Sequence, residues 1–198
     1  WLREQLAVWG KLPAAERAPG AIRVPQSGQI DPKRAALQLP NGALVVRVLE
    51  PWFENIGKRQ TKSPKVYVRD SGLLHALLGI GDQRALEGHP KAGGSWEGFV
   101  IEQLLARRAH SAAYYWRTQA GAELDLLLFV GHRRIGIEIK RADAPGMTPS
   151  IGTAIRDLKL DRLFVVYPGL IRYALERNAE AIPLSGCADE LLALAGRR

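Results

Sequence analysis

The chain has 198 residues, of which 46% are hydrophobic and 24% charged, a composition typical of a globular domain that buries a sizeable core. Its single cysteine, Cys187, excludes an internal disulfide framework and favours a reducing compartment. No apolar run reaches the roughly 20 residues that span a bilayer, and the first ten residues lack the layout of a signal peptide. We therefore expect a cytoplasmic protein without a membrane partner.

The formal net charge is +8 and the pI is about 9.9. A basic balance favours polyanionic partners, with nucleic acid as the first candidate. One short segment is especially rich in basic residues, which are Lys58, Arg59, Lys62, Lys65 and Arg69. The alternative is a set of solvated surface charges that bind nothing.

The first 42 residues are predicted to form an irregular segment or linker, because prolines and glycines interrupt them repeatedly. The composition changes at residue 43, where an apolar run rich in β-branched residues begins. We expect a basic segment of strands and a helix at 43–94, which leads into the core at 95–198.

The segment that precedes the core begins with ALVVRVLEPW, residues 43–52, a β-branched run that predicts a strand. A second short strand is predicted at residues 65–69. Asp70 or Ser71 can cap the following helix, LLHALLGI, which its leucines predict to be short and buried. Residues 82–94 are predicted to be a polar loop.

The core begins with the clearest helix, residues 95–110, with Ser95 as its expected N-cap and Glu97 in its first turn. The other predicted elements are a strand at 113–118, the hairpin at 121–142, a helix at 148–160 opened by Thr148 and Pro149, a strand at 162–169, weak strands within 172–184, and a closing helix capped by Ser185. This order predicts an α/β fold in which helices flank a mixed central sheet.

The hairpin GAELDLLLFVGHRRIGIEIKRA carries charges between its apolar residues. A two-residue type II′ turn at 131–132 sets Asp125 opposite Glu138 and Glu123 opposite Lys140. On the first strand, alternation predicts that one face is shared by Glu123, Asp125, Leu127 and Phe129.

Two carboxylates in directly opposite positions repel each other, since their Cβ atoms lie about 4.5–5.5 Å apart. A divalent cation would turn this repulsion into attraction, and Mg²⁺ prefers oxygen ligands. Asp125 and Glu138 are therefore candidate metal ligands. Lys140, on the same face, can reach a metal-bound water or a phosphate oxygen.

The core helix adds another carboxylate. Glu97 lies on the apolar side of that helix and is predicted to point at the hairpin, whereas Glu102 is predicted to be exposed. A competing interpretation is a salt-bridged hairpin, in which Glu123 pairs with Lys140, and Asp125 or Glu138 pairs with a nearby arginine. The residue pattern alone leaves both interpretations open.

Four stretches carry a family resemblance: LEPWFENIGKRQTKSPKVYVRDSGLLHALLGI, SWEGFVIEQLL, YYWRTQAGAELDLLL and IGIEIKRA. Over about residues 43–184 the chain resembles the C-terminal domain of unknown function that follows the ATPase core in many prokaryotic AAA+-like ATPases. The pattern of Glu97, Asp125 and Glu138-Ile139-Lys140 also resembles the PD-(D/E)XK nuclease superfamily, although Leu124 stands where that motif has proline.

The resemblance implies a restriction-endonuclease-like fold and a set of roles. Asp125 and Glu138 would bind Mg²⁺ or Mn²⁺, Lys140 would position the attacking water, and Glu97 would assist the metal site. Glu123 belongs to the pattern of the closer family, with a metal-binding or structural role.

The leading hypothesis is a nuclease-like module of an ATPase that binds DNA or cleaves it, with Mg²⁺-dependent phosphodiester hydrolysis as the proposed reaction. Its expected partners are DNA and an ATPase core, and its expected phosphate contacts are Lys58, Arg59, Lys62 and Lys65. The alternative is a non-catalytic regulatory or interaction domain that keeps the nuclease fold. A third possibility is a structural domain whose hairpin charges pair only with each other.

Overall fold

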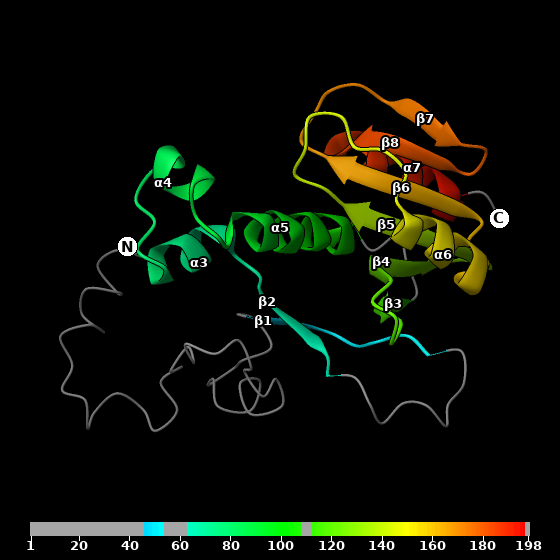
Figure 1. The fold of residues 1–198 in the computed structure, drawn as a ribbon, viewed down its shortest axis with the longest axis horizontal. Coiled ribbons are helices and arrows are strands. Elements are labelled where there is room, and N and C mark those ends of the chain that lie inside the picture. Colours follow the sequence, from blue (N-terminus) through cyan, green and yellow to red (C-terminus); the bar gives the residue numbers. More distant parts are fainter. Residues whose placement is uncertain (1–45, 54–62, 108–111, 197–198) are drawn as a thin grey trace.

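A computed structural model describes residues 46–53, 63–107 and 112–196 (Figure 1). The irregular segment predicted for residues 1–42 lies outside the described residues, as do three of the basic candidates, Lys58, Arg59 and Lys62. The division of the chain at residues 94–95 stays a prediction. No helix within the described ranges is long and apolar enough to cross a membrane.

A six-stranded mixed sheet forms the centre of the molecule. Its strands are β3 (Ala112–Arg117), β4 (Glu123–Val130), β5 (Arg133–Ile139), β6 (Arg162–Tyr167), β7 (Tyr173–Glu176) and β8 (Ala179–Pro183). The spatial order is β3-β4-β5-β6-β8-β7. Strand β6 runs parallel to β5 and β8, whereas the other neighbours are antiparallel.

Helices cover both faces of this sheet (Figure 1). The helices of the described residues are α3 (Ser71–Leu77), α4 (Gln83–Glu87), α5 (Ala92–Ala106), α6 (Pro149–Leu158) and α7 (Leu184–Gly196). Helices α5 and α7 pack against one face, where Leu104 and Leu191 join Leu126 in the core. Helix α6 packs against the other face, where Leu158 joins Leu127. The predicted mixed sheet flanked by helices is confirmed.

Two predicted helix starts are confirmed. Asp70 caps α3, because its side chain accepts a hydrogen bond from the Leu73 N–H at 2.7 Å. Thr148 caps α6 in the same way through the Ile151 N–H, and Pro149 follows at the first helical position. These starts could be predicted because a cap depends on residues only a few positions apart.

Other helix predictions were wrong. Helix α3 has no buried residue, because it extends beyond the sheet (Figure 1). The expected polar loop contains α4, which Asp82 caps. Helix α5 starts at Ala92, so Ser95 lies inside it and Glu97 lies beyond its first turn. Burial of Ala92 and Ser95 stabilises the helical residues that precede the predicted start. Helix α7 starts at Leu184, ahead of Ser185.

The hairpin of β4 and β5 has the predicted register along its described ladder. Leu126 pairs with Ile137, and Leu128 pairs with Ile135. The turn lies at residues 131–132, and Gly131 has a φ of +60°. Among described non-glycine residues only Lys159 has a positive φ. Of the two turn residues, Gly131 therefore has a positive φ and His132 does not, as a type II′ turn requires.

Strand β4 contains an irregularity that alternation did not predict. Tyr114 of β3 pairs with Leu127, but Trp116 pairs with Leu124, so β4 holds an extra residue between these two pairs. A bulge of this kind reverses the alternation of side chains. The predicted common face for Asp125 and Leu127 was therefore wrong: Leu127 packs beside α6, while Asp125 extends toward the side of α5.

A small second sheet pairs β1 (Val46–Leu49) antiparallel with β2 (Lys65–Val68). Backbone hydrogen bonds join the chain after β1 to β3, from Trp52 N–H to the Tyr115 carbonyl at 2.7 Å. Tyr67 of β2 packs against Gly98 of α5, where an added Cβ would lie 3.2 Å from the tyrosine ring. The small sheet therefore covers a side of α5 that the central sheet leaves open.

Candidate functional site

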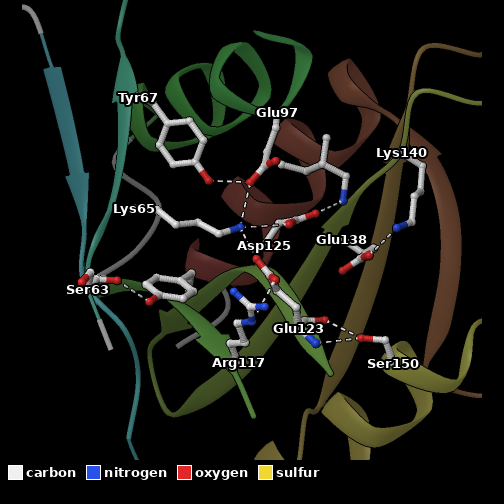
Figure 2. A network of polar contacts seen from close by, with 12 residues as sticks. Ser63, Lys65, Tyr67, Glu97, Arg117, Glu123, Asp125, Glu138, Lys140 and Ser150 are labelled. Carbon is white, nitrogen blue, oxygen red and sulfur yellow. Dashed lines mark hydrogen bonds and ion pairs between the residues drawn. The ribbon is translucent and has the colours of Figure 1, made fainter. Parts of the chain in front are cut away.

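An open pocket of about 430 Å³ lies at the start of β4 and the end of β5 (Figure 2). Strand β2, the first half of α5 and the start of α6 complete its walls. Its charged lining residues include every site residue predicted on the core helix and the hairpin, together with one lysine of β2: Glu97, Glu123, Asp125, Glu138, Lys140 and Lys65. The structure therefore brings together the candidate site residues that the sequence predicted on the core helix and on the hairpin.

Glu138 and Lys140 form an ion pair, with 2.6 Å between Glu138 Oε1 and Lys140 Nζ. The second oxygen, Oε2, is buried and has no hydrogen-bond partner within the described part of the chain. Burial raises the pKa of Glu138, although Lys140 opposes this. The carboxylate thus keeps an acceptor that water or a ligand could satisfy.

Lys140 has a fixed backbone and a more exposed side chain. Its N–H donates to the Val166 carbonyl at 2.9 Å, and its own carbonyl accepts from the Trp96 indole at 3.1 Å. Burial opposes the charge on the ammonium group, but Glu138, Asp125 and Glu97 together outweigh it and raise the Lys140 pKa. The side chain is 39% exposed, so it can reach a molecule at the mouth of the pocket.

Asp125 is unfavourably placed for its charge. Its Oδ2 accepts a hydrogen bond from the Ile139 N–H at 2.9 Å. Burial, then the neighbouring charges of Glu138 and Glu97, raise the Asp125 pKa to about 7. At neutral pH this carboxyl is therefore divided between its charged and neutral forms.

Lys65 is the residue whose position the sequence did not predict. Its Nζ lies 2.5 Å from Glu123 Oε1, 3.0 Å from Glu97 Oε1 and 3.4 Å from Asp125 Oδ1 (Figure 2). Burial opposes its charge, but Glu97 and the other acidic neighbours raise the Lys65 pKa. The lysine expected to contact phosphate thus has its charge matched inside the pocket.

The remaining contacts hold the walls in place. Tyr67 donates a hydrogen bond to Glu97 Oε1. Ser150 of α6 donates to the Glu123 carbonyl at 2.9 Å and accepts from the Glu123 N–H at 2.8 Å. The salt-bridged interpretation expected Lys140 as the partner of Glu123, but the structure pairs Glu123 with Lys65 and Lys140 with Glu138.

The donor set can be tested against the expected cation. Within the described ranges, no three His, Cys, Asp or Glu side chains are arranged to hold one metal ion together. Mg²⁺, however, is often held by one or two carboxylates, with water completing its coordination. Asp125 and Glu138 supply two such carboxylates beside an open pocket, and Glu138 Oε2 has no competing donor. The residues therefore fit the ion as a two-carboxylate site.

A second carboxylate centre lies farther along α5. Glu102 was predicted to be exposed but is only 8% exposed, because the small sheet covers it. Arg47 Nε lies 2.5 Å from Glu102 Oε1, and Arg69 Nε lies 2.9 Å from Oε2. These two guanidinium groups outweigh the effect of burial and lower the pKa of Glu102.

Comparisons with known proteins add a relationship but no activity. Residues 92–187 match the family model of a domain of unknown function (DUF4143). Residues 33–84 match a second domain of unknown function (DUF8612). Lys65 thus belongs to one matched segment, and the pocket carboxylates belong to the other.

Two mycobacterial relatives are similar to the chain over most of its length. They are the uncharacterized proteins Mb2031c of Mycobacterium bovis and Rv2008c of Mycobacterium tuberculosis, each 54% identical over 166 residues. The match covers 81% of this chain but only 38% of each relative. No solved structure matches.

Proposed function

We propose that the pocket is a divalent-cation site for phosphodiester hydrolysis in DNA, within a nuclease-like module of the PD-(D/E)XK type that accompanies an ATPase core. One observation carries the proposal: Glu97, Asp125, Glu138 and Lys140 come from three separate elements and converge on one open pocket. Buried carboxylates with raised pKa values are common at catalytic sites.

Each side chain has a distinct role in this proposal. Asp125 and Glu138 hold the cation, with Glu97 and Glu123 beside them. Mg²⁺ or Mn²⁺, when bound, would supply an activated water and stabilise negative charge on the phosphate. Lys140, at the mouth of the pocket, orients that water or a phosphate oxygen through its ammonium group.

The charge of the whole chain supports a polyanionic substrate. The net charge is +8 although the pocket itself is acidic. Arg141 is exposed and lines the pocket beside Lys140. We propose that it contacts phosphate groups of DNA together with three basic residues of the undescribed segment, Lys58, Arg59 and Lys62.

The direct test is incubation of the purified chain with supercoiled and with branched DNA in the presence of Mg²⁺ or Mn²⁺. We expect cleavage that falls about 100-fold or more in Asp125→Asn and Lys140→Met. Glu176→Gln, an exposed change on β7, is the matched control and should cut normally. An uncut substrate, or equal cutting by all variants, would reject the enzymatic proposal.

A second candidate function is a non-catalytic regulatory or interaction domain of an ATPase. The contacts of Lys65 with three pocket carboxylates favour it, since they neutralise charge without a metal. The small share of each relative that the chain spans also leaves room for a catalytic core elsewhere in those proteins. Calorimetric titration with MgCl₂ or MnCl₂ separates the candidates, because this one predicts no measurable binding by the wild-type chain.

A further inference from the structure

Lys65 reaches the pocket from outside the domain that supplies the carboxylates. It lies on β2, within the segment 33–84 that matches one family model, whereas Glu97, Glu123 and Asp125 lie within 92–187. Its ammonium group contacts an oxygen of each of these three carboxylates, at 2.5 to 3.4 Å. The lysine thus contacts one proposed metal ligand, Asp125, and the two carboxylates that lie beside the proposed site.

The surroundings hold this lysine in position. The Lys65 ammonium lies 5.4 Å from the centroid of the Tyr115 ring, a cation–π contact that favours its charged form. The Tyr115 hydroxyl donates to the Ser63 carbonyl at 2.6 Å, which ties down the chain just before β2. The Lys65 side chain is 24% exposed and that of Asp125 is 14% exposed, so water screens their interaction less than at the surface.

Lys65 and a divalent cation compete for Asp125, which contacts the lysine and is also a proposed metal ligand. Mg²⁺ requires oxygen ligands at about 2.0–2.1 Å in nearly octahedral geometry. Two cations a few ångströms apart in a partly buried pocket repel strongly. Simultaneous occupation of the carboxylate cluster by both is therefore unfavourable.

We propose that Lys65 is an internal cation that occupies the carboxylate cluster in the metal-free protein and must withdraw before a divalent ion binds. The proposal rests on the proposed function insofar as Asp125 and Glu138 are the metal ligands. It adds a regulatory consequence: the docking of β2 on α5 and the binding of metal oppose each other. Because such coupling is reciprocal, whatever loosens the small sheet increases metal affinity.

The test is calorimetric titration of the full chain with MnCl₂ and with MgCl₂. Lys65→Met removes the charge and keeps most of the side-chain volume. We expect it to bind either metal about tenfold more tightly than the wild type, or better still. Lys91→Met, at an exposed lysine just before α5, should leave the affinity unchanged.

The outcomes separate this inference from the proposed function. Equal or weaker metal binding by Lys65→Met, with DNA cleavage by the wild type, would overturn the inference and leave the proposed function standing. Binding by Lys65→Met but not by the wild type would support the inference and count against a catalytic wild-type site. The absence of binding by both proteins would overturn both.

A second measurement uses the wild type alone and does not depend on whether the variant folds. Amide hydrogen exchange is followed in β2, at Val66, Tyr67 and Val68, with and without excess MnCl₂. We expect faster exchange in the presence of metal, because a displaced Lys65 no longer anchors the strand. Unchanged or slower exchange would overturn the inference.

Discussion

Two buried carboxylates, Glu102 of α5 and Glu138 of β5, behave in opposite ways. Glu102 is 8% exposed and Glu138 is 5% exposed, so their burial is nearly the same. Two arginines lower the pKa of Glu102, whereas burial raises the pKa of Glu138, whose ion-pair partner among the described residues is Lys140. The number and kind of cationic partners, and not burial itself, decide whether the pKa of a buried carboxylate is lowered or raised.

The difference separates a structural ion pair from a candidate site. Around Glu102, guanidinium groups bond to both oxygens, and such matched geometry compensates for lost solvation. Around Asp125 and Glu138, acidic groups crowd together and one oxygen has no described partner. Proteins keep such unfavourable arrangements mainly where function requires them.

The largest effect is expected at the matched centre. Glu102→Gln removes the charge that Arg47 and Arg69 share, and should lower the free energy of unfolding by about 3 kcal/mol. This loss lies at the lower end of the range for a broken buried ion pair, because the two arginine side chains are partly exposed. Urea denaturation measures the change, with exposed Glu176→Gln as a control expected within about 0.5 kcal/mol of wild type. A small loss for Glu102→Gln would show that the ion pairs contribute little.

The next effect depends on pH. The pKa of Asp125 is raised from 3.8 to about 7, so between these values the folded chain binds more protons here than the unfolded chain. The wild type therefore loses stability at this site as pH rises through that range, whereas Asp125→Asn does not. Between about pH 5 and about pH 6.5, the stability of the variant relative to wild type should rise by about 2 kcal/mol, because one extra bound proton corresponds to about 1.4 kcal/mol per pH unit. Urea denaturation across this range measures the effect. The raised pKa would be contradicted if the free energy of unfolding depended on pH in the same way in both proteins.

A smaller effect of opposite sign to that of Glu102→Gln is expected at Glu138. Glu138→Gln removes a buried charge with one unpartnered oxygen and keeps an acceptor for Lys140. The free energy of unfolding should stay constant or rise by up to about 1 kcal/mol. The same urea measurement applies. A loss as large as that of Glu102→Gln would mean that the two centres are equally well matched.

The smallest effect tests the contact between Tyr67 of β2 and Gly98 of α5. Gly98→Ala would place a Cβ 3.2 Å from the Tyr67 ring and push β2 away from α5. We expect a net loss below about 1 kcal/mol, because the helix propensity of alanine offsets part of the strain. Gly94→Ala is the matched control: its Cβ would meet nothing within 4 Å, so it should be neutral or stabilising in thermal unfolding. Equal behaviour of both variants would show that the Tyr67 contact is loose.

Local features of the fold could be predicted from the sequence. The register of β4 and β5 follows from a two-residue turn with glycine at its first position. The caps Asp70 and Thr148 act on backbone groups only a few residues away. The convergence of Asp125, Glu138 and Lys140 follows from the same hairpin, because register fixes which residues come close.

Long-range contacts account for most of what was missed. Lys65 meets Glu97 across 32 positions of sequence, and Arg47 meets Glu102 across 55. Nothing in the helical pattern of α5 shows that a second sheet covers Gly98 and Glu102. The bulge before Leu127 depends on pairing with β3, which alternation along β4 alone does not reveal.

The small sheet is short, and among the residues of its two strands Leu49 is the buried one. Arg47 pairs with Tyr67, while Val48 pairs with Val66, so alternation divides the sheet into a valine face and a face that also carries Leu49 and Lys65. If β2 slipped by one residue, its valines would turn toward α5, and Lys65 and Tyr67 would turn away from Glu97. The contacts of Lys65 and Tyr67 with Glu97 thus favour the observed pairing over the slipped one, which two short valine-rich strands would otherwise tolerate.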